Sequence, residues 1–151
     1  MIANHDAVSV IIRSKNEERW IGHSIQSVID TFNDVEIIIV DNGSKDDTLF
    51  ITKNFIEDPN FKNKKGSYAD IKIYNLEDYT PGKSINFGVT KCKNNIVMIL
   101  SAHCVIQKFE KILFERLKKF KCLFGKQIPI WNGKKISKRY IWSHFIDDEK
   151  I

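Results

Sequence analysis

The 151-residue sequence predicts an α/β protein: three layers, α/β/α, built around a mainly parallel, doubly wound sheet. The first observation is alternation, because apolar runs typical of strands alternate with segments whose apolar residues recur at helical spacing. Second, Ile37–Val40 and Ile96–Leu100 contain no polar residue, as expected of strands covered on both faces. Third, these two runs and Ala7–Ile12 end in polar residues, which would converge where the carboxyl ends of neighbouring strands meet.

The elements are expected in the order β-α-β-α-β-α-β, with a further helix after the last strand. Strands are expected at Ala7–Ile12, Ile37–Val40, Ala69–Tyr74 and Ile96–Leu100. The third of these alternates apolar and polar residues, which indicates a strand near the edge. Helices are expected after Asn16, after Ser44, from about Lys83 to Cys92, and at Lys108–Lys121. Asn16 is expected to cap the first helix, with Glu17 and Glu18 in its first turn, and Ser44 with Asp47 has the pattern of a capping box.

Composition is typical of one soluble domain spanning 1–151. Hydrophobic residues make up 42% and charged residues 28%, and no apolar run approaches the length of a membrane span. The first residues do not form a basic segment followed by an apolar one, so no signal peptide is expected. Cys92, Cys104 and Cys122 have no paired spacing, which is typical of reduced thiols. We therefore expect a cytoplasmic protein.

The net charge of +5 is unevenly distributed. From Val105 onward there are 12 Lys and Arg against 5 Asp and Glu, whereas residues 1–104 hold 12 against 14. A basic segment of this kind can bind nucleic acid, the inner face of an anionic membrane or a phosphorylated substrate. The segment lacks an RNA-binding signature and zinc-finger spacing, which argues against nucleic acid. A solvated basic face is the simplest interpretation, and peripheral membrane contact stays open.

Several segments carry a resemblance to a known family. They are Val8–Ile12, Lys15–Glu18, Glu36–Thr48, Pro81–Gly88 and Ile96–His103. Together they resemble the amino-terminal half of a family 2 glycosyltransferase, an enzyme of the GT-A (nucleotide-diphospho-sugar transferase-like) fold that uses a nucleotide-activated sugar. The resemblance is good over about residues 7–105 and faint over 106–151. Neither a P-loop nor a dinucleotide-binding glycine motif is present, which argues against an NTPase or a dehydrogenase.

The resemblance implies a site for a nucleotide sugar, with a UDP-sugar favoured. The residues implied are Arg13, Ser14, Asn16, Glu17, Asp41, Lys83, Asn86, Ser101 and His103. Asp41 would accept a hydrogen bond from the base, and Lys83 would meet the phosphate or the base edge; a carboxylate suits an imide N–H, and a lysine suits a diphosphate. Two other interpretations stay open: Asp41 only caps the turn at Asn42-Gly43, and Lys83 is a solvated lysine.

The expected metal motif is replaced. Ser101-Ala102-His103 stands where the family has Asp-x-Asp, the two carboxylates that bind a divalent cation. Mg²⁺ prefers oxygen ligands, and an imidazole better suits Mn²⁺ or a transition metal. Three roles for His103 stay open: a lone metal ligand, a direct contact to the diphosphate, or a polar residue at a strand end.

The sequence after His103 is short for this family. Only 48 residues follow, whereas family members place the acceptor site and the catalytic base well beyond this strand. Asp147-Asp148-Glu149 is the sole acidic cluster in that tail, and a position so near the terminus suits a base poorly. No catalytic residue is therefore assigned.

Two functions are weighed. The first is a glycosyltransferase that transfers a sugar to an acceptor hydroxyl in surface polysaccharide or glycoconjugate synthesis. The alternative is a truncated, non-catalytic sugar-nucleotide-binding module that needs a second chain. Aromatic residues at Trp131, Tyr140, Trp142 and Phe145 need burial or a partner, so self-association through this region is expected under the alternative.

Overall fold

A computed structural model describes residues 7–57, 69–131 and 133–135 of the chain. The chain forms two compact units, Met1–Lys111 and Ile112–Ile151, and each is described by itself. The expectation of a single domain over 1–151 stays a prediction. No helix among the described residues combines the length and apolar character needed to cross a bilayer.

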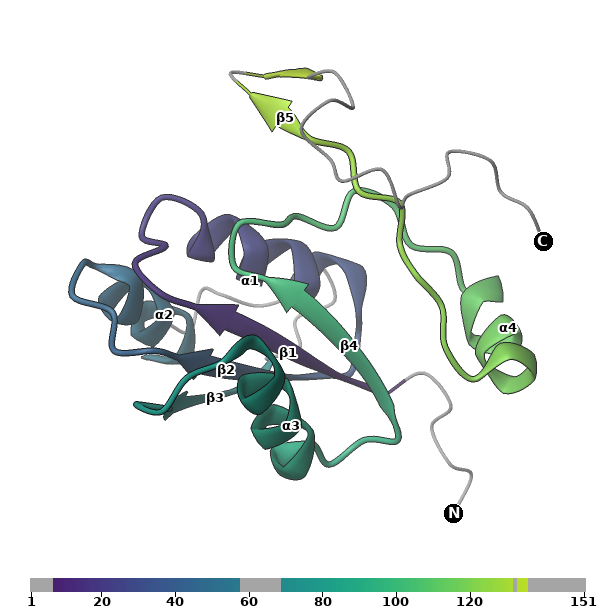
Figure 1. The fold of residues 1–151 in the computed structure, drawn as a ribbon. Helices are drawn as coiled ribbons and strands as arrows, with labels where there is room; N and C mark the ends of the chain where they lie inside the picture. Colours follow the sequence, from purple (N-terminus) through teal and green to yellow (C-terminus); the bar gives the residue numbers. More distant parts are fainter. Residues whose placement is uncertain (1–6, 58–68, 132, 136–151) are drawn as a thin grey trace. The chain divides into compact units, whose positions relative to one another are not determined.

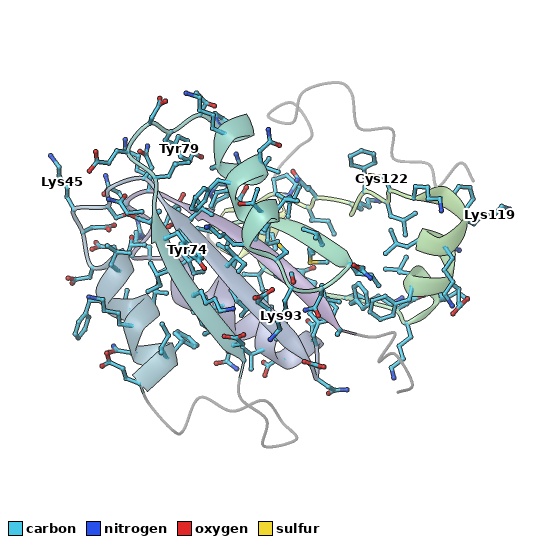
Figure 2. The ribbon with its side chains drawn as sticks, turned by 90° about the horizontal axis from the view of Figure 1, so that it is seen from below. Lys45, Tyr74, Tyr79, Lys93, Lys119 and Cys122 are labelled. Atoms are coloured by element: carbon cyan, nitrogen blue, oxygen red, sulfur yellow. The ribbon has the colours of Figure 1, made fainter. Side chains whose placement is uncertain are left out.

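The first unit alternates strands and helices as predicted. Its elements are β1 (Val8–Ser14), α1 (Ile21–Thr31), β2 (Val35–Asp41), α2 (Thr48–Glu57), β3 (Asp70–Asn75), α3 (Pro81–Lys91) and β4 (Ile96–Ser101). The four strands are parallel and lie in the order β3-β2-β1-β4 (Figure 1). Helices α1 and α2 cover one face and α3 covers the other (Figures 1 and 2), as right-handed crossovers in both directions require. The predicted three-layer, doubly wound fold is confirmed.

The core lies on both faces of the two central strands, against α1 on one face and α3 on the other. Every residue of β2 is buried, and β1 is buried apart from a partly exposed Arg13. Helix α1 buries one apolar face, made of Ile21, Ile25, Val28 and Ile29. This stripe follows the helical spacing seen in the sequence, so the first helix lies where its periodicity predicts.

Strand β4 is not fully buried, contrary to expectation. It pairs with β1 on one side and is the outermost strand of the four, and Ile99 remains 49% exposed. An apolar run records only that a strand is hydrophobic, whereas its place in the sheet depends on long-range pairing. Strand β3, expected near an edge, occupies the other edge.

The first helix begins later than predicted. Asn16 adopts a left-handed conformation (φ 53°) and does not cap α1. Instead, the carbonyl of Glu17 accepts hydrogen bonds from the N–H groups of Trp20 and Ile21, and the helix proper starts at Ile21. Glu17 and Glu18 therefore lie in the preceding loop. Asn16, Glu17 and Glu18 have the pattern of a helix start, but they form a separate loop before α1.

The second helix also begins later, at Thr48 rather than after Ser44. The Ser44 hydroxyl donates to Asp41, so it does not cap the helix. Asp46 accepts instead from the N–H and the hydroxyl of Thr48. The predicted capping box is therefore wrong, because the Ser44 hydroxyl hydrogen-bonds to Asp41 at the end of β2 and does not cap α2.

Helix α3 packs very closely on β1. A Cβ at Gly88 would lie 2.7 Å from Cγ2 of Ile11, a fully buried residue. Thr80 precedes the helix, and its side chain accepts a hydrogen bond from the N–H of Lys83. Pro81 occupies the first helical turn, where its missing N–H costs nothing. Helix α3 thus begins at Pro81, two residues before the predicted start at about Lys83.

A buried carboxylate joins the strands near their amino ends. Glu36 is 0% exposed and accepts hydrogen bonds from Ser9 Oγ (2.6 Å), the N–H of Lys93 (2.8 Å) and Lys72 Nζ (2.9 Å). Burial alone would raise the pKa of Glu36, but these hydrogen bonds and the Lys72 charge outweigh it and lower the pKa. The cluster ties β1, β2 and β3 to the segment that precedes β4.

The second unit contains α4 (Ile112–Phe120) and a short antiparallel pair, β5 (Ile130–Trp131) and β6 (Lys134–Lys135). Helix α4 is shorter than predicted, and Phe114 is its buried residue, whereas Ile112 and Phe120 are exposed. Leu123–Gly125 have no regular secondary structure. Tyr140, Trp142, Phe145, Asp147–Glu149 and the Trp131 side chain lie outside the described residues.

Candidate functional site

The predicted convergence of polar residues occurs at the carboxyl edge of the sheet. Ser14 is the register partner of Asp41 on β2, and Arg13 is the register partner of Ser101 on β4. Beyond the strands, the N–H of Asn42 donates to the Ser14 carbonyl (3.0 Å). Because these residues follow three neighbouring strands, they form one edge of the kind where open α/β sheets bind ligands.

Asp41 lies at the centre of this edge and is 1% exposed. Its Oδ1 accepts from the hydroxyls of Ser14 (2.8 Å) and Ser44 (2.5 Å), and its Oδ2 accepts from the N–H of Ser44 (2.8 Å). The left-handed Gly43 (φ 63°) makes the turn that brings Ser44 back to the carboxylate. Asp41 thus braces the turn, as one interpretation held. A carboxylate has about four acceptor positions, so one is unused among the described residues.

Two loops at this edge are joined by hydrogen bonds. We name residues 15–20, after β1, the first loop and residues 42–47, after β2, the second loop. The N–H of Asn16 donates to Ser44 Oγ (2.9 Å), and the Asn16 side-chain oxygen accepts from the N–H of Lys45 (2.8 Å). The N–H of Glu17 donates to Thr48 Oγ1 (2.7 Å). Asn16, with its left-handed backbone, therefore joins the two loops through both its N–H and its side-chain oxygen.

A second set of contacts joins the same loops further from the sheet. The N–H of Glu18 donates to Asp46 Oδ2 (3.1 Å), and the Glu18 carboxylate accepts from the N–H of Asp47 (3.1 Å). Burial would raise the pKa of Asp46, but hydrogen bonds from Thr48 and Glu18 outweigh it and lower the pKa. Asp46 is therefore ionised at neutral pH, and its carboxylate accepts hydrogen bonds from the N–H groups around it.

Glu17 and His103 also meet at this edge. Oε1 of Glu17 lies 2.9 Å from Nδ1 of His103, which joins the first loop to the segment after β4. Nearby in the register, Arg13 Nη2 lies 3.5 Å from Ser101 Oγ. Arg13 Nε is buried and has no hydrogen-bond partner among the described residues. The edge thus holds the Arg13 guanidinium, whose Nε–H has no partner among the described residues, and the His103 imidazole, whose Nδ1 is held by Glu17.

Lys83 and Asn86 are not brought into contact with the other predicted residues. Lys83 lies in the first turn of α3 and forms an ion pair with Asp78 at the surface. Asn86 lies one turn further along α3 and is exposed. Helix α3 begins at the carboxyl edge of the sheet, so both residues stay candidates, and their roles stay predictions.

The described residues do not fit an oxygen-coordinated divalent cation. No three of His, Cys, Asp and Glu gather into a metal-binding group within the described ranges. Ser101-Ala102-His103 offers a hydroxyl and an imidazole, and the Nδ1 of that imidazole already meets Glu17. In nucleotide sites Mg²⁺ is usually held by one or two carboxylates together with substrate phosphates, and Ser101-Ala102-His103 supplies no carboxylate.

Four polar residues of the two loops were not anticipated as part of the site. Glu18, Ser44, Asp46 and Thr48 hold the loops together, although the sequence presented them as helix starts. One signal was available: both loops follow neighbouring strands, so polar residues on one loop have partners on the other.

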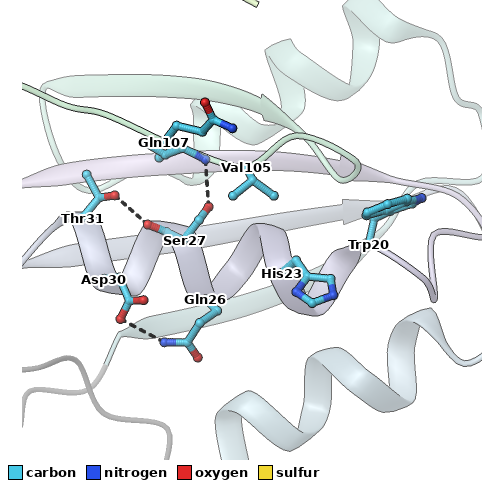
Figure 3. Close-up of a pocket in the computed structure, with 9 residues that line it drawn as sticks. Trp20, His23, Gln26, Ser27, Asp30, Thr31, Val105 and Gln107 are labelled. Atoms are coloured by element: carbon cyan, nitrogen blue, oxygen red, sulfur yellow. Dashed lines mark hydrogen bonds between the residues drawn. The ribbon is translucent and has the colours of Figure 1, made fainter. Parts of the chain in front are cut away.

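A groove of about 540 Å³ lies elsewhere in the same unit, along α1 (Figure 3). Its lining includes Trp20, His23, Gln26, Asp30 and Val105. It contains none of the residues predicted to bind a nucleotide sugar, so the carboxyl edge remains the candidate site.

A parallel α/β/α sheet with this polar carboxyl edge defines a doubly wound α/β protein, a class in which ligands bind at this edge. Residues 9–141 match Glycosyl transferase family 2, and the chain belongs to this family. The predicted family resemblance is confirmed.

Individual relatives agree with this assignment. The 4,4'-diaponeurosporenoate glycosyltransferase of Staphylococcus aureus is 36% identical over 52 residues, which are 34% of this chain and 14% of that protein. The structure of S. aureus TarS 1-349 in complex with UDP-GlcNAc superposes with a TM-score of 0.58 at 20% identity, covering 82% of this chain and 37% of that one.

A mannosyltransferase from Pyrobaculum calidifontis, PcManGT, in complex with GDP-Man and Mn²⁺, superposes with a TM-score of 0.55 at 17% identity. That match covers 67% of this chain and 28% of the mannosyltransferase. At these identities the solved structures establish the fold, which is that of GT-A glycosyltransferases. The chain spans well under half the length of each of these three proteins.

Proposed function

We propose that this chain binds a nucleotide-activated sugar, a UDP-sugar, at the carboxyl edge of its sheet. We further propose that it takes part in transferring the sugar to an acceptor hydroxyl in surface polysaccharide or glycoconjugate synthesis. The observation that carries the proposal is the edge itself, where two joined loops surround a buried Asp41 that keeps a free acceptor position. Family membership supports the same assignment.

The residues of the edge take complementary parts in this proposal. Asp41 accepts from the imide N–H of uracil with its remaining lone pair, while Ser14 and Ser44 hold the carboxylate in place. Arg13, His103 and Lys83 supply cationic donors for the diphosphate, on which charge grows as the sugar leaves. In the displacement we envisage, a base removes the acceptor proton, the hydroxyl attacks the anomeric carbon, and the bond from that carbon to the diphosphate oxygen breaks so that the nucleoside diphosphate leaves.

The proposed location is the cytoplasm, with peripheral contact to the inner face of the membrane as a further proposal. Cys92, Cys104 and Cys122 are free thiols, and burial raises the pKa of Cys92 and Cys104. Thiols held in their neutral form react slowly, which is compatible with a reducing compartment.

Isothermal titration calorimetry with a panel of UDP-, GDP- and dTDP-sugars tests the binding function. We expect a UDP-sugar to bind and GDP-sugars to bind more weakly, because guanine offers a different hydrogen-bonding edge to Asp41. The titrations are run with and without Mn²⁺. If no sugar nucleotide binds under either condition, the proposed function is wrong.

A second candidate is a sugar-nucleotide-binding module that works only with another chain. The observation in its favour is β4, whose outer edge is unpaired among the described residues and carries the half-exposed Ile99. Unpaired apolar edges favour association with another strand. Light scattering separates the candidates: a stable assembly that binds sugar nucleotide without turnover supports the module, and turnover by a monomer contradicts it.

A further inference from the structure

We propose that this chain holds the diphosphate of its nucleotide without a divalent cation, and that His103, positioned by Glu17, takes the place of the metal. This inference rests on the proposed function, because it concerns the diphosphate of the same ligand. It goes further by assigning a metal-free mode of binding and a specific pair of residues.

The position of His103 is the first argument. The β1–β4 ladder ends at Arg13 and Ser101, and the N–H of Ala102 then donates to the Arg13 carbonyl (3.2 Å). His103 follows directly, so the backbone delivers it to the carboxyl edge beside the first loop. Its side chain is 59% exposed and therefore accessible to a ligand.

The contact with Glu17 is the second argument. Because Glu17 Oε1 lies 2.9 Å from Nδ1, the ring donates from Nδ1 and its orientation is fixed, which leaves Nε2 as the nitrogen available to a ligand. Between a carboxylate and a phosphate, an imidazole donates from both nitrogens only in its protonated form. Glu17 thus fixes which ring nitrogen of His103 meets the diphosphate.

Glu17 is itself held in place, which qualifies it as a positioning residue. Its backbone N–H donates to Thr48 Oγ1 (2.7 Å), and its carbonyl accepts the first bonds of α1. Its side chain is 23% exposed, less than half the value for His103. The carboxylate therefore reaches His103 from a fixed backbone.

Charge balance is the third argument. The Glu17–His103 pair is neutral overall once His103 is protonated, so a second cation is needed to offset a diphosphate. Arg13 is the residue beside Ser101 in the register, and its buried Nε has no partner among the described residues. An orphaned guanidinium N–H is costly unless a ligand satisfies it. Together, the His103 ring and the Arg13 guanidinium place N–H donors at the position where the family has the two carboxylates of its metal motif.

The test compares UDP with uridine, which lacks phosphates, by calorimetry in EDTA, in Mg²⁺ and in Mn²⁺. We expect UDP to bind more tightly than uridine, with the same affinity in all three conditions. His103→Ala should lower UDP affinity about tenfold or more, the range for a lost charged hydrogen bond, and leave uridine affinity unchanged. His23→Ala, which removes an exposed histidine of α1, is the matched control and should change neither affinity.

Glu17 is tested by graded substitution. Glu17→Gln keeps an oxygen that can accept from Nδ1, so it should lose less UDP affinity than Glu17→Ala. A purely structural role would lower uridine and UDP affinity alike, and thermal melting of each variant establishes that it is folded.

Two results overturn the inference: UDP binding that requires Mg²⁺ or Mn²⁺, or UDP affinity unchanged in His103→Ala. If uridine binds and UDP binds no more tightly, the metal-free diphosphate site is wrong while the nucleoside site stands. If neither compound binds the wild-type protein in any condition, the proposed function fails together with this inference.

Discussion

Asp41 has two roles that one side chain can fill together. Its three accepted hydrogen bonds hold the second loop against β1, and its fourth acceptor position is free for a nucleotide base. The two interpretations that the sequence left open therefore do not exclude each other at the atomic level. Bracing the turn and binding the base use different acceptor positions of the carboxylate, so substitutions can separate the two roles.

Asp41→Asn and Asp41→Ala should each lower both thermal stability and UDP affinity. Asn replaces one acceptor oxygen with a donor amide, so either Ser44 or the base loses its partner; Ala removes both oxygens. We expect about 1–3 kcal/mol of lost stability and a loss of about ten- to a hundredfold in affinity. Melting curves and calorimetry measure the two effects on the same samples.

Asp30→Asn is the matched control, since Asp30 is an exposed aspartate of α1 whose acceptor Oδ1 the amide can mimic. A loss of stability in the Asp41 variants without any loss of UDP affinity would confine Asp41 to bracing the turn.

The site residues show which part of a site a sequence can reveal. Strand ends place Ser14, Asp41 and Ser101 at one edge, and pairing with neighbouring strands is enough to predict that. Partners across loops are harder to predict, because Asn16 and Ser44 have side chains that suit a helix cap equally well. Only the fold decides that each contacts the other loop instead.

At the scale of elements, the packing of α3 on β1 depends on one missing Cβ. Gly88→Ala should destabilise the protein by about 1–3 kcal/mol, because the new methyl group would overlap the buried Ile11 and force the helix outward. The gain in helix propensity from alanine, about 0.5–1 kcal/mol, does not offset this. Urea-induced unfolding followed by circular dichroism measures the difference.

Gly82→Ala provides the comparison within the same helix. A Cβ at Gly82 meets no atom within 4 Å, so this variant should be as stable as the wild type or slightly more so. Equal behaviour of the two alanine variants would show that the close approach at Gly88 carries no packing cost.

Element type was predicted well, whereas position within the sheet was not. Periodicity reports which face of an element is apolar, and it identified β1, β2, α1 and α3 correctly. It could not distinguish β4 at an edge from a central strand, because Ile96–Leu100 is apolar on both faces. Whether a strand lies at the edge of a sheet depends on which strands pair with it, and the local sequence does not contain this information.

For the whole molecule, Glu36 is one of the carboxylates with a lowered pKa that govern the response to acid. Its pKa is lowered in the folded protein from the ordinary value of 4.5, so its contribution to stability is present above that value and is lost as the pH falls through the folded pKa. Because the carboxylate ties three strands and the segment before β4, protonating it loosens the sheet at its amino ends. The free energy of unfolding should therefore decline below about pH 4.5.

Glu36→Gln tests this directly. At neutral pH the variant should be less stable by about 1.5–3 kcal/mol, because Lys72 loses one of its two carboxylate partners and the amide cannot accept at both positions. Below pH 4.5 its stability should vary less with pH than that of the wild type. Denaturant unfolding across a pH series measures both, with Glu77→Gln as an exposed control. Parallel acid limbs for wild type and Glu36→Gln would assign the acid sensitivity to other carboxylates.

The cross-bonded first and second loops have a further consequence, for the thermodynamics of binding. A site whose loops are already ordered freezes few torsions when a ligand arrives, so association should carry little conformational entropy cost. Hydrogen exchange would reveal this order, because the amides of Asn16, Glu17 and Lys45 already donate to the opposite loop or to Thr48. The exchange of these amides should be slow in the free protein and should slow little further when nucleotide binds, because the loops are already ordered.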